Sequence, residues 1–254
     1  MKKELRTYSF DGIDKLNCQI WLPEGLEGPL PAILFLHGSG ERGTDESILA
    51  FQALPKYLTA GREIPAVVIC PQCPEETNWK GILPQLGFVL EDILQSYPID
   101  RAKVAITGIS MGAATVVTAA GTPLPPNVMG VLADCGFTSA RDIIYEVIRQ
   151  MKLPPKLCYP FVKLAARLYG GFDLEETSPM SALKNCTVPI IFYHGEDDDF
   201  VPCHMSRTMY EACPTRKALV TVPGAGHGLA FPVDQQNYLD TLREFFGPEA
   251  SYTQ

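Results

Sequence analysis

The sequence predicts an α/β fold in which helices flank a mostly parallel, twisted β-sheet. Short apolar runs rich in β-branched residues recur along the chain, and segments with helical spacing lie between them. Several runs are apolar at consecutive positions, which is typical of parallel strands that helices cover on both faces. Right-handed crossovers would connect such strands. The expected strands are Cys18–Leu22, Ala32–Leu36, Ala66–Cys70, Lys103–Thr107, Met129–Ala133, Pro189–Tyr193 and Leu219–Val222.

Apolar residues three or four positions apart predict the helices between these strands. A helix-forming run from Ala113 to Ala120 follows the strand Lys103–Thr107. Two amphipathic stretches show the same spacing, the first with Leu86, Val89, Leu90, Ile93, Leu94 and Tyr97, and the second with Leu239, Leu242 and Phe246. We therefore expect an α/β sandwich with the sheet between two layers of helices.

One interval, residues 138–172, breaks the alternation of strands and helices. It holds two helix-like segments, Ser139–Met151 and Leu157–Tyr169, with Pro154 and Pro155 between them and no strand pattern. Gly170 and Gly171 would end the second segment. We interpret the interval as a small helical lid inserted into a single domain that comprises residues 1–254. An ordinary pair of crossover helices packed on the sheet is the alternative, and it stays open.

The composition indicates a globular protein and excludes several classes of partner. Of the 254 residues 46% are hydrophobic and 20% charged, so one large core can form. The net charge of −8 would repel phosphate backbones, and the 21 basic residues are spread out, so we expect no nucleic-acid partner. No segment has the roughly 18 consecutive apolar residues of a membrane helix. We expect a cytoplasmic protein without a membrane partner, and the sequence leaves a homodimer open.

A glycine-flanked serine directly follows the expected strand Lys103–Thr107. The segment Gly108-Ile109-Ser110-Met111-Gly112 connects that strand to the helix-forming run. Glycines, which lack a Cβ, allow a sharp turn in which Ser110 would adopt a strained conformation with its hydroxyl exposed. The amino terminus of the helix would favour negative charge that develops there. Ser110 is therefore the candidate nucleophile, and a serine in an ordinary glycine-rich turn is the alternative.

A second glycine-rich turn, His37-Gly38-Ser39-Gly40, ends the strand Ala32–Leu36. Open α/β sheets bind their ligands beyond the carboxyl ends of the strands, where this turn lies. We expect the backbone amides of Ser39 and Met111 to bind an oxyanion, which would lower the barrier of acyl transfer by roughly a few kcal/mol. His37 precedes the turn, so we expect it to hold the loop by hydrogen bonds and not to transfer protons.

An acidic loop with the sequence HGEDDDFVP follows the strand Pro189–Tyr193 and extends from His194 to Pro202. A carboxylate at this place can orient a catalytic histidine and stabilise its protonated form. Chemistry alone does not choose among its acids, which are Glu196, Asp197, Asp198 and Asp199. A calcium-binding loop, whose ligand spacing is not matched here, and a solvated acidic turn are the alternatives.

The candidate base is His227, in the loop PGAGHG after the last expected strand. The small residues around it would let the ring approach a serine, whereas His204 lies beside a helix-like segment and has no such setting. A lone loop histidine is more often a surface residue. Here, however, a serine, an acid and a histidine each follow a strand of their own, in the chain order of hydrolases with a G-x-S-x-G turn.

Together these segments resemble the bacterial α/β-hydrolase superfamily over nearly the whole chain. The part from Ser110 onwards, with ADCGFTS and HGEDDDFVP, looks like small helical-lid hydrolases of Gram-positive bacteria. The segments LFLHGSGERGTD and ICPQCPEETNW are similar to the dienelactone-hydrolase, feruloyl-esterase and predicted-peptidase branch. The resemblance implies the α/β-hydrolase fold, an oxyanion amide from Ser39, and Asp198 as the acid, because it is the fifth residue of an HGxxDxxVP pattern. Asp134 lies where some members of this fold keep their acid, and it is the second candidate.

Two residues near the expected catalytic edge are candidates for substrate binding. Trp79, on a loop that leaves this edge, would line the acyl or alcohol pocket, and packing on its neighbours is the alternative. Arg42 follows the oxyanion turn and would meet a substrate carboxylate. We favour the alternative, in which Arg42 pairs with an acid such as Glu41 or Asp45.

The cysteines do not indicate a redox or metal site. Cys70 and Cys73 have the spacing of a redox pair, but no helix begins there to lower a thiol pKa. Zinc would need two more ligands at suitable spacing, and the sequence offers none. We expect reduced, mostly buried thiols, no metal and no cofactor.

The combined pattern predicts a serine hydrolase that cleaves a small or medium ester through an acyl-enzyme. Ser110 would attack the carbonyl, His227 would accept its proton, and water activated by the same histidine would release the acid. A serine at the turn argues against haloalkane dehalogenase and epoxide hydrolase chemistry, which uses an aspartate there. A serine peptidase or acyl-thioesterase is the first alternative. The second is a non-catalytic ligand-binding protein, whose expected signature is a missing triad residue.

Overall fold

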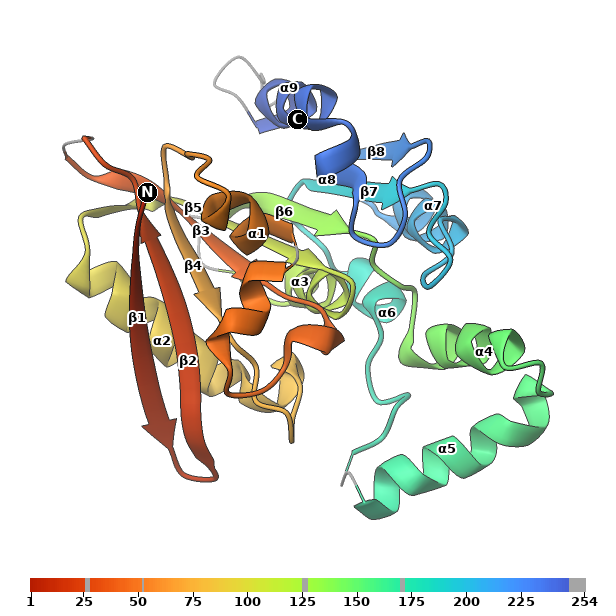
Figure 1. Cartoon of the computed structure of the whole chain (residues 1–254). Coiled ribbons are helices and arrows are strands. Elements are labelled where there is room, and N and C mark those ends of the chain that lie inside the picture. Colours follow the sequence, from red (N-terminus) through yellow and green to blue (C-terminus); the bar gives the residue numbers. More distant parts are fainter. Residues whose placement is uncertain (26–27, 52, 125–127, 170–171, 247–254) are drawn as a thin grey trace.

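The computed structural model describes residues 1–25, 28–51, 53–124, 128–169 and 172–246. Its strands are β1 (Lys2–Phe10), β2 (Ile13–Leu22), β3 (Leu30–Leu36), β4 (Val67–Pro71), β5 (Ile99–Ile109), β6 (Val128–Asp134), β7 (Ile190–Gly195) and β8 (Lys217–Val222). They form an eight-stranded sheet in the order β1-β2-β4-β3-β5-β6-β7-β8 (Figure 1). β2 runs antiparallel to β1 and β4, and the strands from β4 to β8 are parallel. The predicted fold class is confirmed.

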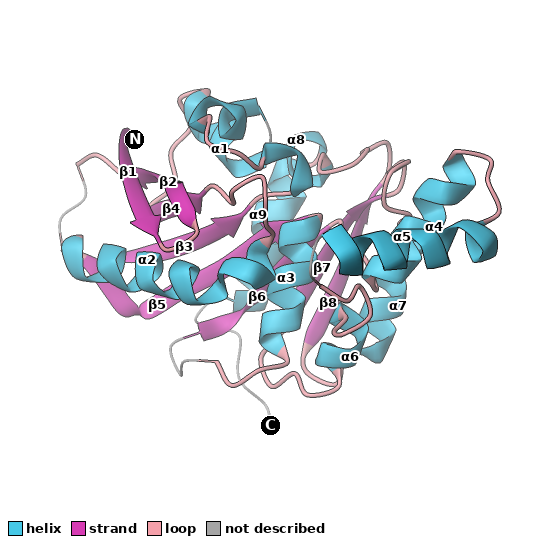
Figure 2. Ribbon diagram, turned by 90° about the horizontal axis from the view of Figure 1, so that it is seen from below, coloured by secondary structure: helices cyan, strands magenta, loops and turns pink. Residues whose placement is uncertain are grey.

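Helices lie on both faces of this sheet (Figure 2). The α-helices are α1 (Ala53–Thr59), α2 (Leu83–Ser96), α3 (Met111–Ala120), α4 (Ala140–Gln150), α5 (Pro155–Tyr169), α6 (Pro179–Leu183), α7 (His204–Ala212), α8 (Ala230–Val233) and α9 (Gln235–Phe246). The short 3₁₀ helices are η1 (Ser39–Glu41), η2 (Glu46–Phe51) and η3 (Trp79–Ile82). The predicted helical spacing of residues 86–97, 113–120 and 239–246 corresponds to α2, α3 and α9.

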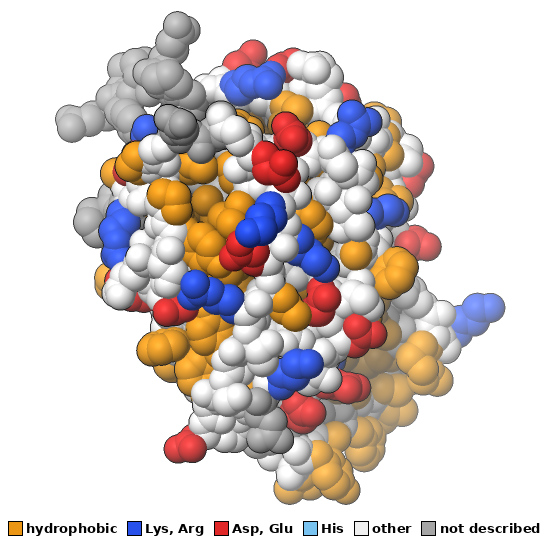
Figure 3. Space-filling model, turned by 60° about the vertical axis from the view of Figure 1, so that its left-hand side comes forward, with side chains coloured by type: hydrophobic (Ala, Val, Ile, Leu, Met, Phe, Trp, Pro, Cys, Tyr) orange, Lys and Arg blue, Asp and Glu red, His pale blue; other side chains and the backbone are white. Residues whose placement is uncertain are grey.

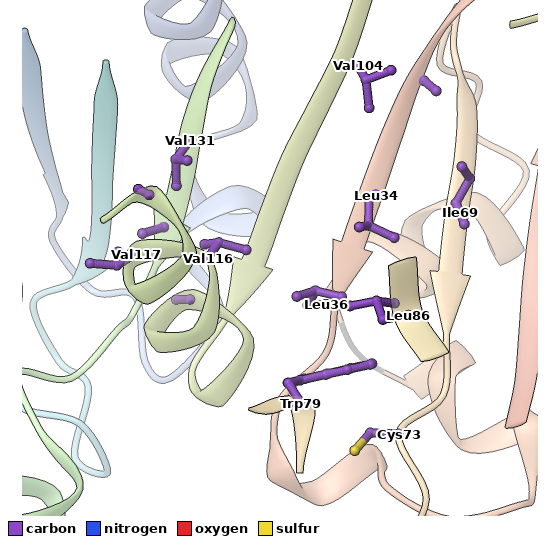
Figure 4. Close-up of a cluster of buried hydrophobic side chains, with 14 of the residues drawn as sticks. Leu34, Leu36, Ile69, Cys73, Trp79, Leu86, Val104, Val116, Val117 and Val131 are labelled. Atoms are coloured by element: carbon purple, nitrogen blue, oxygen red, sulfur yellow. The ribbon is translucent and has the colours of Figure 1, made fainter. Parts of the chain in front are cut away.

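The largest core cluster lies between the sheet and the layer that contains α2 and α3 (Figure 4). Leu34, Val104 and Val131 enter it from three neighbouring strands and are nearly inaccessible to solvent. Side chains alternate along a strand, so Phe35 points to the opposite face, where α1 packs. Two further helices, α8 and α9, pack on that same face over β7 and β8. The strands are therefore apolar on both faces, as the sequence predicted.

The edge strand β1 is the strand that the sequence pattern did not predict. Its nine residues, KKELRTYSF, alternate between exposed and half-buried positions, and none is fully buried. Because β1 pairs only with β2, it needs no continuous apolar run. Apolar runs reveal central strands better than edge strands for this reason.

The interval 138–172 contains α4 and α5, which form a hairpin that projects from the body of the molecule (Figures 1 and 2). The predicted stop at Gly170 and Gly171 lies outside the described residues. Large apolar side chains on α5 are exposed, namely Leu157, Phe161, Leu164, Leu168 and Tyr169. On the face seen in Figure 3, hydrophobic side chains gather in a central patch bordered by charged ones, and again at the far lower right. Within the described ranges, no helix combines the length and the apolarity needed to cross a bilayer.

Candidate active site

The loops that follow the parallel strands meet at one edge of the sheet. In the strand register, Leu36 of β3 is opposite Gly108 of β5, and Ile109 is opposite Asp134 of β6. The oxyanion loop, the Ser110 turn and the Asp134 corner therefore leave the sheet at the same level. This register explains how residues far apart in the sequence come close together in space.

Ser110 occupies the sharp turn between β5 and α3. Its φ of 54° and ψ of −113° lie in a region that non-glycine residues rarely adopt. The flanking glycines are required by close packing: a Cβ at Gly108 would lie 2.3 Å from the carbonyl carbon of Gly112. A Cβ at Gly112 would lie 2.0 Å from the carbonyl oxygen of Leu36. The turn is thus pressed against the end of β3, next to the oxyanion loop.

Asp198 and His227 form a hydrogen-bonded pair. The distance from His227 Nδ1 to Asp198 Oδ2 is 2.7 Å, and the backbone amides of Phe200 and Val201 donate to Asp198 Oδ1 at 3.0 and 2.8 Å. Burial alone would raise the pKa of Asp198, but the hydrogen bonds with His194 and His227 hold it well below its usual range. The carboxylate is therefore ionised and orients the ring of His227, leaving Nε2 available.

The loop of His227 packs directly against the serine turn. Gly228 has a φ of +67°, and a Cβ there would lie 2.8 Å from Ile109 Cδ1. The residue after the candidate base thus contacts the residue before the candidate nucleophile. The ring of Phe200 packs edge-on against His227 at 5.0 Å. Among the described residues, no hydrogen bond joins the Ser110 hydroxyl to the His227 ring, so a proton transfer between them requires a closer approach.

The oxyanion loop is held by the buried ring of His37. Its Nδ1 lies 2.6 Å from the carbonyl oxygen of Gly38, and its Nε2 lies 2.9 Å from the backbone nitrogen of Cys73, whose N–H it accepts. A neutral ring with the proton on Nδ1 satisfies both contacts. Burial lowers the pKa of His37 to about 4. His37 therefore fixes the loop, in agreement with the sequence-based expectation, and Nε2 is not free to act as a base.

The two predicted oxyanion donors lie at starts of helices. Met111 is the first residue of α3 and Ser39 the first of η1, where backbone N–H groups have no partner within the helix. Gly38 brings the two segments together, because a Cβ there would lie 3.5 Å from the Cβ of Ser110. The positions of Ser39 and Met111 thus suit amides that bind an anion beside Ser110.

Glu41 is a residue of this site that sequence reasoning missed. It is 5% exposed, and its Oε2 would lie 3.1 Å from a Cβ at Gly38. Burial raises the pKa of Glu41, while the N–H groups of Glu41 and Gly38 and the nearby His227 lower it. The sequence placed Glu41 beside Arg42 as an ion-pair partner, and nothing in its spacing revealed that η1 turns it inward.

The structure agrees with the packing alternative for Trp79 and does not show the ion pair that the sequence favoured for Arg42. Trp79 is fully buried, donates from Nε1 to the carbonyl of His37 at 3.0 Å and packs on the His37 ring, so it supports the oxyanion loop. Arg42 pairs neither with Glu41 nor with Asp45. Its guanidinium donates to the backbone carbonyls of Ser39, Glu75 and Thr77. Both side chains bind the loop to the segment that follows β4.

Asp134, the second candidate for the acid, lies at the end of β6 and is 6% exposed. Burial raises its pKa to about 6, against the opposing influence of His194 and His227. The carboxylate that accepts the hydrogen bond from the His227 ring is that of Asp198. Asp134 Oδ1 has no hydrogen-bond partner among the described residues.

All eight cysteines lie within the described ranges and have free thiols, six of them buried. Burial raises the pKa of Cys73 to about 12, which disfavours redox reactivity of the Cys70 and Cys73 pair. Cys135, Asp198 and His227 each offer one atom that could bind a metal ion, and these three atoms lie within 4.8 Å of one another. In this structure two of the three are used by the Asp198–His227 hydrogen bond.

Comparisons with known proteins show the family and the fold of this chain. The model of the alpha/beta hydrolase family matches residues 33–240. The uncharacterized protein YqkD of Bacillus subtilis (strain 168) is 27% identical over 154 residues, which are 60% of this chain and 50% of YqkD. The chain therefore spans about half the length of that relative.

Solved structures share the fold. The thermophilic esterase Est2 of Thermogutta terrifontis has a TM-score of 0.67 at 18% identity, over 98% of this chain and 95% of its own. The acylaminoacyl peptidase of Pyrococcus horikoshii has a TM-score of 0.67 at 16% identity, over all of this chain and 43% of its own. At these identities the likeness shows a common fold.

Proposed function

This chain belongs to the alpha/beta hydrolase family, and we propose that it is a serine esterase that hydrolyses small or medium carboxylic esters through an acyl-enzyme. The observation that carries the proposal is the strained Ser110 at the start of α3, packed against the loop of a histidine that a buried carboxylate orients. Such a set of groups serves acyl transfer, in which a hydroxyl must be activated and an oxyanion stabilised.

The proposed reaction begins with attack of Ser110 Oγ on the ester carbonyl carbon. His227 Nε2 takes the serine proton, and Asp198 stabilises the resulting imidazolium through Nδ1–H. The carbonyl oxygen becomes an oxyanion that accepts hydrogen bonds from the amides of Ser39 and Met111. The bond to the leaving alkoxy oxygen then breaks, and this oxygen receives the proton from Nε2. Water attacks the acyl-enzyme in the same way, so that the acid leaves and Ser110 regains its proton.

The hairpin of α4 and α5 is proposed to act as a lid on this edge. It follows β6 directly, so it starts beside the catalytic loops. The side-chain amide of Gln150, at the end of α4, donates to the carbonyl oxygen of Asp199 at 2.5 Å, one residue from Asp198. The exposed apolar side chains of α5 are suited to contact the acyl chain of an ester.

The test is the Ser110→Ala variant assayed with p-nitrophenyl acetate and butyrate. We expect a loss of kcat of at least about a thousandfold, because Ser110 is the nucleophile. A fluorophosphonate probe should label the wild type at Ser110 and leave the variant unlabelled. Ser47→Ala, at an exposed position of η2, is the matched control and should keep full activity and labelling. Full activity of Ser110→Ala would refute the proposal.

Peptidase and thioesterase activities need the same groups, so the substrate class has to be measured. Matched ester, thioester and aminoacyl-amide substrates with one acyl group should give the highest kcat/KM for the ester. A higher value for the amide would make the protein a peptidase with the same catalytic residues.

A further inference from the structure

An apolar groove lies on the face of the sheet that carries α1, α8 and α9. It has a volume of about 570 Å³, within the range of small-molecule sites. Its floor is formed by β3, β5 and β6, and its walls by α1 on one side and α9 on the other. Ser110 and His227 do not line it, although Ile109 and Gly228, their neighbours in the sequence, do. The groove therefore excludes the candidate nucleophile and base, although one end of it reaches the catalytic edge.

The alternation of side chains on β5 explains why the groove is open. Val104 and Ile106 point into the core beneath α2 and α3, so Ala105 and Thr107 point to the opposite face. Ala105 is exposed, although β5 is a central strand of the sheet. Central parallel strands are normally covered on both faces. Here α1 and α9 leave the middle of β5 uncovered.

Aromatic contacts connect the two walls at the catalytic end of the groove. Tyr57 of α1 meets Phe231 of α8 edge-on at 4.9 Å, and Phe231 meets Tyr238 of α9 at 5.2 Å. At the other end Phe246 packs on Gly130, where a Cβ would lie 2.4 Å from the Phe246 ring. The groove thus follows β5 from the Gly130 end towards Asp134. Its surface is apolar nearly throughout.

The carboxyl group of Asp134 stands at the catalytic end beside the buried Tyr238, whose hydroxyl interacts with it. Val131 and Ala133 of β6 point into the core on the other face, so Leu132 and Asp134 point towards the groove, and both line it. Asp134 is 6% exposed, and its Oδ1 accepts no hydrogen bond within the described part of the chain. An unsatisfied buried oxygen is costly and rare in native proteins. A ligand that donates a hydrogen bond at this point would satisfy it.

We propose that this groove binds a long-chain primary alcohol, with its hydroxyl donating to Asp134 and its chain lying along β5. The distance from Ala105 to Ile109 is about 13 Å at about 3.3 Å per residue, the length of an extended chain of about ten carbon atoms. The apolar walls would bury the chain, and the hydroxyl would remove the cost of the unpaired oxygen. A fatty acid fits less well, because its carboxylate would meet the carboxyl group of Asp134.

The test uses the whole protein and a fluorescent apolar probe, N-phenyl-1-naphthylamine. Decan-1-ol should displace the probe, and 1-methoxynonane, which has the same atoms but no donor, should displace it about tenfold less well. In Asp134→Leu the two ligands should displace the probe equally. If both ligands displaced the probe from the wild type equally well, the proposal would be overturned. This outcome does not depend on a variant that could fail to fold.

A second variant locates the site. Ala105→Phe fills the groove at its exposed central position and touches no catalytic group, so decan-1-ol binding should weaken at least about tenfold. Its esterase activity should equal that of the wild type, with folding checked by circular dichroism. Unchanged decan-1-ol binding in Ala105→Phe would place the alcohol elsewhere and refute the proposal. The proposal would also be refuted by a second outcome. In this outcome the wild type sediments as a dimer, and Ala105→Phe dissociates the dimer without changing the binding of decan-1-ol.

Discussion

Asp198 is held at both of its carboxylate oxygens, which makes it the most constrained residue of the site. Oδ1 accepts from the backbone amides of Phe200 and Val201, and Oδ2 accepts from His227 Nδ1. His194 Nε2 lies 3.3 Å from the same Oδ2. The neighbouring acids, Asp197 and Asp199, are exposed. The environment therefore selects one carboxylate from a run in which chemistry alone could not choose.

The Asp198→Asn variant should lose kcat by about 10⁴-fold. An asparagine side chain can donate to Nδ1, which favours the tautomer with its proton on Nε2 and leaves the ring unable to accept from Ser110. Steady-state kinetics on p-nitrophenyl butyrate would measure the loss. Asp197→Asn and Asp199→Asn are the matched controls and should retain wild-type kcat. A loss in Asp134→Asn with none in Asp198→Asn would instead assign the acid to the end of β6.

Among the elements, α3 and β3 approach so closely that one glycine determines how they pack. In Gly112→Ala the new Cβ would lie 2.0 Å from the Leu36 carbonyl oxygen, so α3 must move away from β3. We expect a loss of about 1–3 kcal/mol in the free energy of unfolding, because overpacking displaces backbone. kcat/KM should fall as well, since the same contact sets the Ser110 turn beside the oxyanion loop.

Urea denaturation and ester kinetics would measure both effects of this substitution. Gly40→Ala is the control, because it lies in the oxyanion loop and a Cβ there meets no atom within 4 Å. If Gly112→Ala matched Gly40→Ala in stability and activity, the close packing of α3 on β3 would not control the site.

The α4–α5 hairpin supplies a prediction about substrate chain length. Replacing Phe161 and Leu168 of α5 by serine should raise KM for decanoate esters and leave kcat for acetate esters unchanged, if these side chains contact the acyl chain. Both residues are exposed, so the free energy of unfolding should stay within about 0.5 kcal/mol. Lys156→Ser, on the same helix, is the control. If the ratio of KM for decanoate esters to KM for acetate esters did not change, α5 would not contact the acyl chain of the substrate.

At the scale of the whole molecule, the pH dependence of stability should reveal the buried His37. The folded protein holds the pKa of His37 at about 4, below its ordinary value of 6.5. Between these values the unfolded chain binds a proton that the folded chain does not. The free energy of unfolding should therefore fall as the pH drops from 6.5 towards 4, by up to roughly 3 kcal/mol from this group.

Urea midpoints measured at several pH values would test this in the wild type and in His37→Gln. Asp134 acts in the opposite direction, because burial raises its pKa to about 6, so the informative quantity is the difference between the two curves. The His37→Gln curve should be flatter in this range, and that of His204→Gln, an exposed histidine, should parallel the wild type. Parallel curves for all three proteins would contradict the role assigned to His37.

The sequence predicted the central sheet and the catalytic turns because both depend on local patterns. Apolar runs specify strands covered on both faces, and the glycines around Ser110 are required wherever a helix begins so close to a strand. Those features could be recognised without coordinates. The same reasoning paired His227 with an acid of the β7 loop, where the structure places Asp198.

The features that the sequence did not predict depend on contacts between segments that are distant in the chain. Trp79 turns inward because η3 brings its indole N–H to the carbonyl of His37. Arg42 reaches the carbonyl groups of Glu75 and Thr77, in the segment that precedes η3. Glu41 becomes buried through the turn of η1. Such contacts follow from tertiary packing, and neither periodicity nor spacing encodes them. The open middle of β5 likewise reflects the positions of α1 and α9 and not the pattern of the strand itself.

The charged outer strand β1 has a consequence for solubility. It presents Lys2, Lys3 and Arg6 along the side of the sheet that has no further neighbour. Positive side chains on this edge strand discourage a strand of another copy of the protein from pairing with it, and such pairing is how fibrillar aggregates begin. Removing β1 would leave β2 outermost, with the backbone groups that now pair with β1 left without partners. A protein truncated in this way would aggregate through the exposed edge of β2.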